Sequence, residues 1–270
     1  LANIQSQNAI QRFLFGVWAL ASFALNGTLF RYIRTSWRYG LFFLYPALLV
    51  LTALAPLSLL LAGRAFAAAG VLISVCLLWL FVKKMHLLIM LDNWSFARAF
   101  ALERDAEILA KSELFKSVMQ KRTETFHRAN GGGEVLVAAH SLGACFAALA
   151  LGGTLKDMPP HQPAPGLLMV GSSLLKIALH PKAVQLRAAV GEIARSDAVW
   201  LDVQSLTDLL NFYRADPAVA LGIPAKRQPA LQFVRFRTML TPETYRRIKF
   251  NWLRVHRQFV LAAERRTHYS

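Results

Sequence analysis

The sequence predicts an α/β protein in which a parallel sheet follows a transmembrane helical hairpin. Two uncharged apolar runs lie close together in the first third of the chain, at residues 41–62 and 65–82. Further along, short strand-like segments alternate with helical ones, the order from which a parallel sheet with crossover helices is built. We therefore expect a membrane-associated helical region at 1–91 and an α/β domain at 92–270.

The composition favours a membrane protein with a basic surface. The 270 residues are 55% hydrophobic, the mean hydropathy is +0.37, and 31 Lys and Arg stand against 15 Asp and Glu. Such an excess of positive charge is typical of proteins that bind nucleic acid or anionic lipid, and the apolar content favours lipid. The sequence has no recognisable nucleic-acid module and no metal-ligand spacing, so we expect no nucleic acid, metal or cofactor.

The first apolar run, 41–62, holds 22 residues without a charge, and a spanning helix needs about 20. Only two residues separate it from the run at 65–82, so we predict a tight hairpin over about 41–82. Basic residues flank both open ends of this hairpin: Arg31, Arg34, Arg38, Lys83 and Lys84. By the positive-inside rule we expect both open ends and the α/β domain to be cytoplasmic, and we expect the membrane to be a bacterial inner membrane.

The apolar run at 13–30 allows two interpretations. If it spans the membrane, the N-terminus lies outside the cell; if it lies in the interface as an amphipathic helix, the N-terminus stays inside. The Trp, Arg and Tyr residues at 31–39 suit a membrane interface in either case.

The elements of the second region follow in order. Residues 86–94 are expected to form a strand or the end of a membrane helix, and 95–129 one or two helices, which the "NGGG" at 130–133 would end. A Pro-rich loop is expected at 154–166. The predicted strands are 134–139, 166–173, 198–205 and 231–240, and the predicted helices among them are 142–151, about 181–194 and 242–264.

The stretch "EVLVAAHSLGA", residues 134–144, has the pattern of a nucleophile elbow. An apolar strand leads into a turn at Ser141, and small apolar residues follow. The residues two before and two after the serine are Ala139 and Gly143, which are small enough for a strand and a helix to meet closely. The alternative is an ordinary strand-to-helix turn with a buried serine, because short motifs also occur by chance.

On these residues the chain resembles the α/β-hydrolase superfamily, and within it serine lipases and esterases that carry Ala at the first elbow position. The resemblance covers about residues 131–260. It implies a hydrolase-like sheet topology, Ser141 as nucleophile and the backbone N–H of Leu142 as an oxyanion donor. A second donor would follow an early strand; residues 91–94 are a weak candidate. Since the chain begins at Leu1 rather than Met, we expect a piece of a longer protein, in which that strand and its donor lie upstream of Leu1 or do not exist.

The family order Ser, Asp, His implies an acid after a later strand, and three aspartates are available near 198–205. Asp202 lies inside the predicted strand. Asp208 lies just past its end, at the edge where α/β sheets place ligand groups. Asp216 precedes a proline and suits a turn or a helix cap. We predict Asp208 as the acid, with Asp216 second.

The predicted base is His256, because it follows both the acid and the last predicted strand. His268 lies in the C-terminal tail. In this scheme neutral His256 takes the proton of Ser141, and Asp208 holds the imidazole in the required tautomer. The alternative is a histidine on a helix surface among arginines.

The sequence therefore predicts a membrane-anchored serine hydrolase that acts on a carboxylic ester or a lipid ester. The alternative is a catalytically silent hydrolase-like scaffold or accessory subunit of a membrane protein complex. A transporter or channel is disfavoured because the hairpin carries no intramembrane charge. Over residues 226–270, Lys and Arg outnumber Asp and Glu eleven to two, which favours contact with anionic lipid headgroups at about 1 kcal/mol per charge near the surface.

Overall fold

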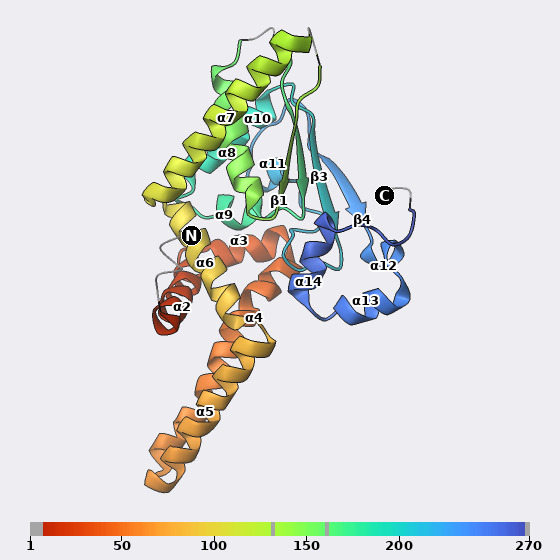
Figure 1. Ribbon diagram of the computed structural model, residues 1–270. Helices are drawn as coiled ribbons and strands as arrows, with labels where there is room; N and C mark the ends of the chain where they lie inside the picture. Colours follow the sequence, from red (N-terminus) through yellow and green to blue (C-terminus); the bar gives the residue numbers. More distant parts are fainter. Residues whose placement is uncertain (1–7, 131–132, 160–161, 268–270) are drawn as a thin grey trace. The chain divides into compact units, whose positions relative to one another are not determined.

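The computed structural model describes residues 8–130, 133–159 and 162–267. The chain divides into two compact units (Figure 1). We call Leu1–Phe30 with Gly40–Ala99 the helical unit, and Arg31–Tyr39 with Phe100–Ser270 the sheet unit. A four-stranded parallel sheet and two long apolar helical segments are present, as the sequence predicted.

The helical segments begin with α2 (Ala9–Leu25) and α3 (Thr28–Thr35), followed by α4 (Trp37–Leu54), η1 (Ala55–Ala62), α5 (Arg64–Lys84) and α6 (Leu87–Leu102). Two stretches are long and apolar enough to cross a membrane, Trp37–Ala62 and Phe66–Lys84. Only 22% and 17% of the most apolar part of each stretch is buried inside the protein. Most of this apolar surface therefore needs a covering from outside the protein. Helices α2 and α3 pass the same test only as a bent pair, which leaves both interpretations of 13–30 open.

Residues 86–94, for which the sequence left a choice between strand and helix, are helical from Leu87 onwards. They form the first half of α6 and supply much of the core of the helical unit. The ring of Trp94 meets the rings of Phe23 and Phe43 edge-on, with centroids 5.3 and 4.8 Å apart. Asp92 of the same helix pairs with Arg12 of α2. The pattern is therefore that of a buried helix rather than a strand.

The sheet unit alternates strands and helices. In chain order its elements after α6 are α7 (Ala106–Asn130), β1 (Leu136–His140), α8 (Gly143–Asp157), β2 (Gly166–Val170), α9 (Leu174–Ala178), α10 (Val184–Arg195), β3 (Trp200–Ser205), α11 (Pro217–Ala220), β4 (Ala230–Val234), α12 (Phe236–Met239), α13 (Pro242–Ile248), α14 (Trp252–Arg257) and η2 (Gln258–Val260).

The four strands are parallel and lie in chain order, β1-β2-β3-β4. In a parallel sheet with this strand order, right-handed crossovers place all connecting helices on one face. Figure 1 shows the connecting helices α8 and α10 on one face of the sheet, together with α7, which precedes β1. Along β2, Leu167 and Met169 are fully buried, whereas the alternate residues are half-buried. His140 pairs in register with Val170, so the residues after β1 and β2 meet at the carboxyl edge of the sheet.

Helix α8 packs tightly against α10. A Cβ built on Gly152 would lie 2.5–2.8 Å from backbone atoms of Ala189, closer than any real side chain approaches. The absence of a side chain at Gly152 therefore sets the separation of α8 and α10.

The two cysteines of the chain have opposite surroundings. Cys145 in α8 is completely buried, whereas Cys76 in α5 is exposed; both are free thiols.

The segment Arg31–Tyr39 belongs to the sheet unit although it lies between two apolar segments in the sequence. The ring of Tyr39 stacks on that of Phe212 at 3.9 Å, and the hydroxyl of Tyr32 donates to the carbonyl of Lys176. Arg38 donates to the carbonyl of Leu206 at 2.9 Å. The contacts with Leu206 and Phe212 support the loop that follows β3, and the contact with Lys176 holds α9.

Three sequence expectations in this unit are wrong. The strand predicted at 231–240 ends at Val234, because the chain turns at Arg235 into helix α12, Phe236–Met239. The helix predicted at 242–264 is three short helices, because Asn251 interrupts it and caps α14 by accepting from the Arg254 N–H. Helix α8 runs to Asp157, beyond its predicted end, and so occupies the start of the loop expected at 154–166. Residues 160–161 of that loop, and 131–132 of the predicted helix stop, lie outside the described residues.

Candidate functional site

Ser141 lies in the turn between β1 and α8 with a backbone φ of +56°. This left-handed conformation is unfavourable for a residue with a side chain and persists only where the surroundings enforce it. Its N–H donates to the Val170 carbonyl at 3.3 Å, and its own carbonyl accepts from the N–H of Ser173 at 3.1 Å. Both bonds anchor the turn to the end of β2. A strained serine between strand and helix has the geometry that a nucleophile elbow requires.

Asp208 lies in the loop after β3 and is fixed there by local hydrogen bonds. Its N–H donates to the Ser205 carbonyl, and its Oδ1 accepts from the Leu210 N–H at 3.0 Å. The side chain of Asn211 donates to the carbonyls of both Ser205 and Asp208. This loop holds the second carboxylate oxygen, Oδ2, toward α14.

His256 is in α14, and its Nδ1 lies 2.9 Å from Oδ2 of Asp208. The two side chains are 5% and 0% exposed. Because an ionised carboxylate only accepts, Nδ1 is the donor, and in the neutral imidazole Nε2 is then the nitrogen with the lone pair. The alternative of a histidine on a helix surface is thereby wrong for His256.

The Nε2 atom of His256 is buried and has no hydrogen-bond partner among the described residues. A buried polar atom without a hydrogen-bond partner costs free energy, and what distinguishes this one is the carboxylate on the other ring nitrogen. Its neighbour Gly171 follows β2 directly beside Ser141, and a Cβ on Gly171 would lie 3.3 Å from His256 Cε1. His256 and Ser141 are thus at the same end of the sheet, although no hydrogen bond joins them in the described chain.

His140 is a second histidine at this edge. Its ring lies 4.7 Å from the ring of His256, and its Nε2 is 3.3 Å from the carbonyl oxygen of His256. Burial lowers the pKa of His140, and the neighbouring His256 lowers it further. In the sequence, His140 is simply the residue before Ser141. Its contact with α14 arises from strand order, which the local sequence does not reveal.

The other two aspartates have different surroundings. Asp202 is buried within β3, accepts from the Gln204 side chain at 2.8 Å, and has its pKa raised to about 7 by burial. Asp216, the second candidate acid, caps α11 by accepting from the N–H groups of Ala218 and Val219. Of the three aspartates, Asp208 is the one that the structure brings to His256.

The N–H of Leu142, the predicted oxyanion donor, has no acceptor among the described residues and lies at the start of α8 beside Ser141. Residues 91–94, the weak candidate for a second donor, are inside helix α6, where backbone N–H groups are already bonded. Gly171 was not singled out from the sequence. The "GSS" that follows β2 was the available signal, since a glycine at a strand end often marks a left-handed residue, and the φ of Gly171 is +54°.

The described residues contain no group of three or more His, Cys, Asp or Glu side chains that could hold a metal ion. His268 lies outside the described residues. Comparison with protein families, curated proteins and solved structures finds no match for this chain. Its function therefore has to be argued from the geometry of the site.

Proposed function

We propose that this chain is a membrane-anchored serine hydrolase that cleaves a carboxylic ester or lipid ester with Ser141, His256 and Asp208. The observation that carries the proposal is the buried hydrogen bond between Asp208 and His256, at 2.9 Å, with a free Nε2 at the strand end that bears Ser141. An α/β-hydrolase-like topology is part of the proposal. Its support is that the serine, the acid and the base follow β1, β3 and β4 in that order.

The chemistry follows from these positions. Nε2 of His256 takes the proton from the Ser141 hydroxyl as its oxygen attacks the ester carbonyl. The Leu142 N–H donates to the oxyanion, and Asp208 stabilises the imidazolium. The imidazolium then protonates the leaving alkoxide, which departs and leaves an acyl-enzyme. His256 then takes a proton from a water molecule that attacks the acyl carbonyl, the bond between the acyl group and Ser141 Oγ breaks, and the proton passes from His256 to Oγ, which releases the carboxylic acid product and restores Ser141.

Membrane anchoring rests on the two apolar segments Trp37–Ala62 and Phe66–Lys84. In the proposal they form a transmembrane hairpin with both ends in the cytoplasm of a bacterial cell, because the basic residues flank those ends. An ester within the lipid layer is then the available substrate. The basic segment 226–270 would add contact with anionic headgroups.

A second candidate is a catalytically silent scaffold or subunit of a membrane complex. Two observations favour it: Ser141 and His256 share no hydrogen bond in the described structure, and Leu142 is the one oxyanion donor identified. A single oxyanion donor is worth about 10²–10³ in rate, so a missing second donor would matter.

Labelling with a fluorophosphonate probe separates the two candidates. The full chain in neutral detergent is incubated with the probe as wild type, as Ser141→Ala and as Ser117→Ala, a control serine on the exposed side of α7. We expect labelling of wild type and of Ser117→Ala, and none of Ser141→Ala. Wild type that does not react, or Ser141→Ala that still does, would support the scaffold.

A further inference from the structure

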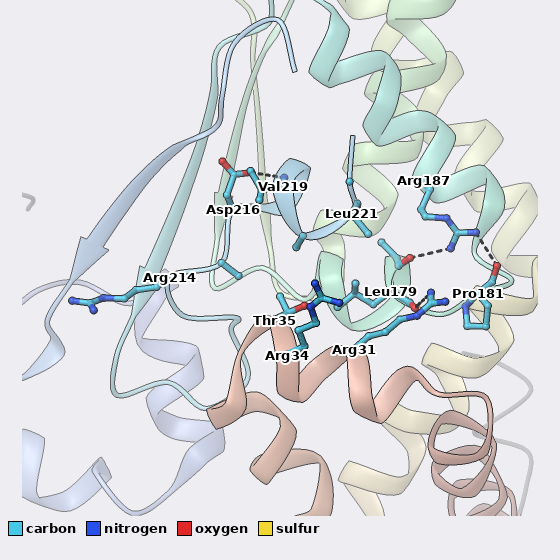
Figure 2. A pocket seen from close by; sticks show the side chains of 14 residues that line it. Arg31, Arg34, Thr35, Leu179, Pro181, Arg187, Arg214, Asp216, Val219 and Leu221 are labelled. Carbon is cyan, nitrogen blue, oxygen red and sulfur yellow. Dashed lines mark hydrogen bonds between the residues drawn. The ribbon is translucent and has the colours of Figure 1, made fainter. Parts of the chain in front are cut away.

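A basic pocket of about 850 Å³ lies in the sheet unit, and Ser141, Asp208 and His256 are not among its lining residues. Figure 2 shows it between α3, the turn after α9, the start of α10 and the segment around α11. Four arginines and one aspartate line it: Arg31, Arg34, Arg187, Arg214 and Asp216.

Arg31 and Arg187 hold the same turn from two different helices. Arg31 donates to the Leu179 carbonyl at 3.0 Å. Arg187 donates to the carbonyls of Ala178, His180 and Pro181 at 3.1, 2.6 and 2.8 Å. Carbonyls of four consecutive residues therefore keep two like-charged guanidinium groups near each other.

The two like charges of Arg31 and Arg187 repel each other. The pKa of Arg187 is lowered, first by burial and then by the charge of Arg31, while the Glu103 carboxylate opposes part of this shift. Among the described residues, no carboxylate forms an ion pair with Arg31, Arg34 or Arg187. The carboxylate of Asp216 already accepts two N–H groups of α11 and lies apart from these arginines in Figure 2.

The pocket also has hydrogen-bond donors to spare. A guanidinium has five N–H donors in a planar fork. Arg31 uses one bond on the turn, and Arg34 makes no side-chain hydrogen bond among the described residues. Arg214 is different, because its side chain points away from the pocket and lies over the ring of Tyr213.

Guanidinium forks match the oxygens of a phosphate group, which accepts several charge-assisted hydrogen bonds at once. We propose that the pocket formed by Arg31, Arg34 and Arg187 binds a phosphate group, carried by a phospholipid headgroup or by a free phosphate compound. The two sources share this chemistry. A headgroup is within reach along the chain, because Arg34 lies three residues before Trp37, where a candidate span begins, a backbone distance of at most about 11 Å.

The proposal is tested by titration calorimetry on the full chain in neutral detergent. Inorganic phosphate and short-chain phosphatidic acid are titrated separately, with sodium chloride at matched ionic strength as reference. The variants are Arg34→Gln and, as a control with the same charge change, Arg122→Gln on the exposed surface of α7. Arg34 is exposed and holds no other described residue, so its replacement leaves the fold intact.

We expect saturable binding to wild type and to Arg122→Gln, weakened about tenfold or more in Arg34→Gln. Binding of both ligands supports a site open to free phosphate compounds, and binding of phosphatidic acid alone supports a site for headgroups. Absence of binding to wild type, or equal weakening in the two variants, would overturn the proposal. Because Ser141 takes no part, this outcome is independent of the labelling experiment.

Discussion

His256 donates its Nδ1–H to the Asp208 carboxylate across 2.9 Å, although 48 residues separate the two in the chain. Strand β4 lies between them in sequence, so the pair exists only when the carboxyl edge of the sheet is assembled. Both side chains are removed from water. A histidine held in this way has one defined tautomer and one nitrogen available for chemistry.

The Asp208→Asn substitution tests the role of this pair. The Leu210 N–H keeps the amide oxygen at the Oδ1 position, so the NH2 group faces His256 Nδ1 and favours the tautomer with the proton on Nε2. The rate constant of fluorophosphonate labelling should therefore fall by about 10³–10⁴. Asp216→Asn is the matched control, because asparagine also caps helices. It should react at close to the wild-type rate. Equal loss in the two variants would remove Asp208 from the proposed mechanism.

Replacement of Gly171 probes the space around the base. A Cβ there would lie 2.5 Å from the Phe259 ring and 3.3 Å from His256. Gly171→Ala should therefore displace His256 and lower the labelling rate by about tenfold or more, since 1 Å of misplacement can cost about 10² in rate. Gly222→Ala introduces a similar backbone strain, at φ +66°, with nothing within 4 Å. If the two variants label equally fast, Gly171 does not position the base.

A third prediction concerns stability at the α8–α10 contact. Gly152→Ala places a methyl group against the Ala189 backbone, which cannot move aside, and should lower the unfolding free energy by about 1–3 kcal/mol. Gly153→Ala meets only the flexible side chain of Lys116. Its gain in helix propensity, up to about 1 kcal/mol, should leave the melting temperature unchanged or raised. Calorimetric melting of both variants in detergent measures the difference, and equal melting temperatures would contradict it.

The buried Asp202 predicts a pH dependence of stability. Burial raises its pKa from 3.8 to about 7. Between these values the folded state holds a proton that the unfolded state has lost, so stability should fall as pH rises from about 4 to 7, by about 1 kcal/mol per pH unit. Above pH 7 this contribution is flat.

The Asp202→Asn variant should lack this slope, whereas Asp197→Asn, at an exposed position, should retain it. The melting temperature measured at several pH values below 7 provides the comparison. The range below pH 7 also avoids the titration of Lys176. Burial lowers the pKa of this lysine to about 7, so its contribution makes the protein more stable as pH rises between about 7 and 10.5. An unchanged slope in Asp202→Asn would assign the titration to another group.

The sequence predicted those parts of the fold that depend on local pattern. The four strands and the two apolar segments follow from runs of apolar residues, and the turn at Ser141 from the small residues beside it. The helix expected at 242–264 failed because periodicity does not register the capping side chain of Asn251. The contact between His140 and His256 and the tight position of Gly171 depend on strand order, which no local window contains.

The contrast between the two cysteines makes the chain its own reporter of membrane insertion. Burial raises the pKa of Cys145 to about 12, so this thiol is unreactive toward maleimides in the folded protein. Cys76, halfway along α5, has no such cover from the protein. A water-soluble maleimide should leave Cys76 unmodified in a vesicle where lipid surrounds that helix, whereas its modification there would place α5 in water, and no residue has to be replaced for the measurement.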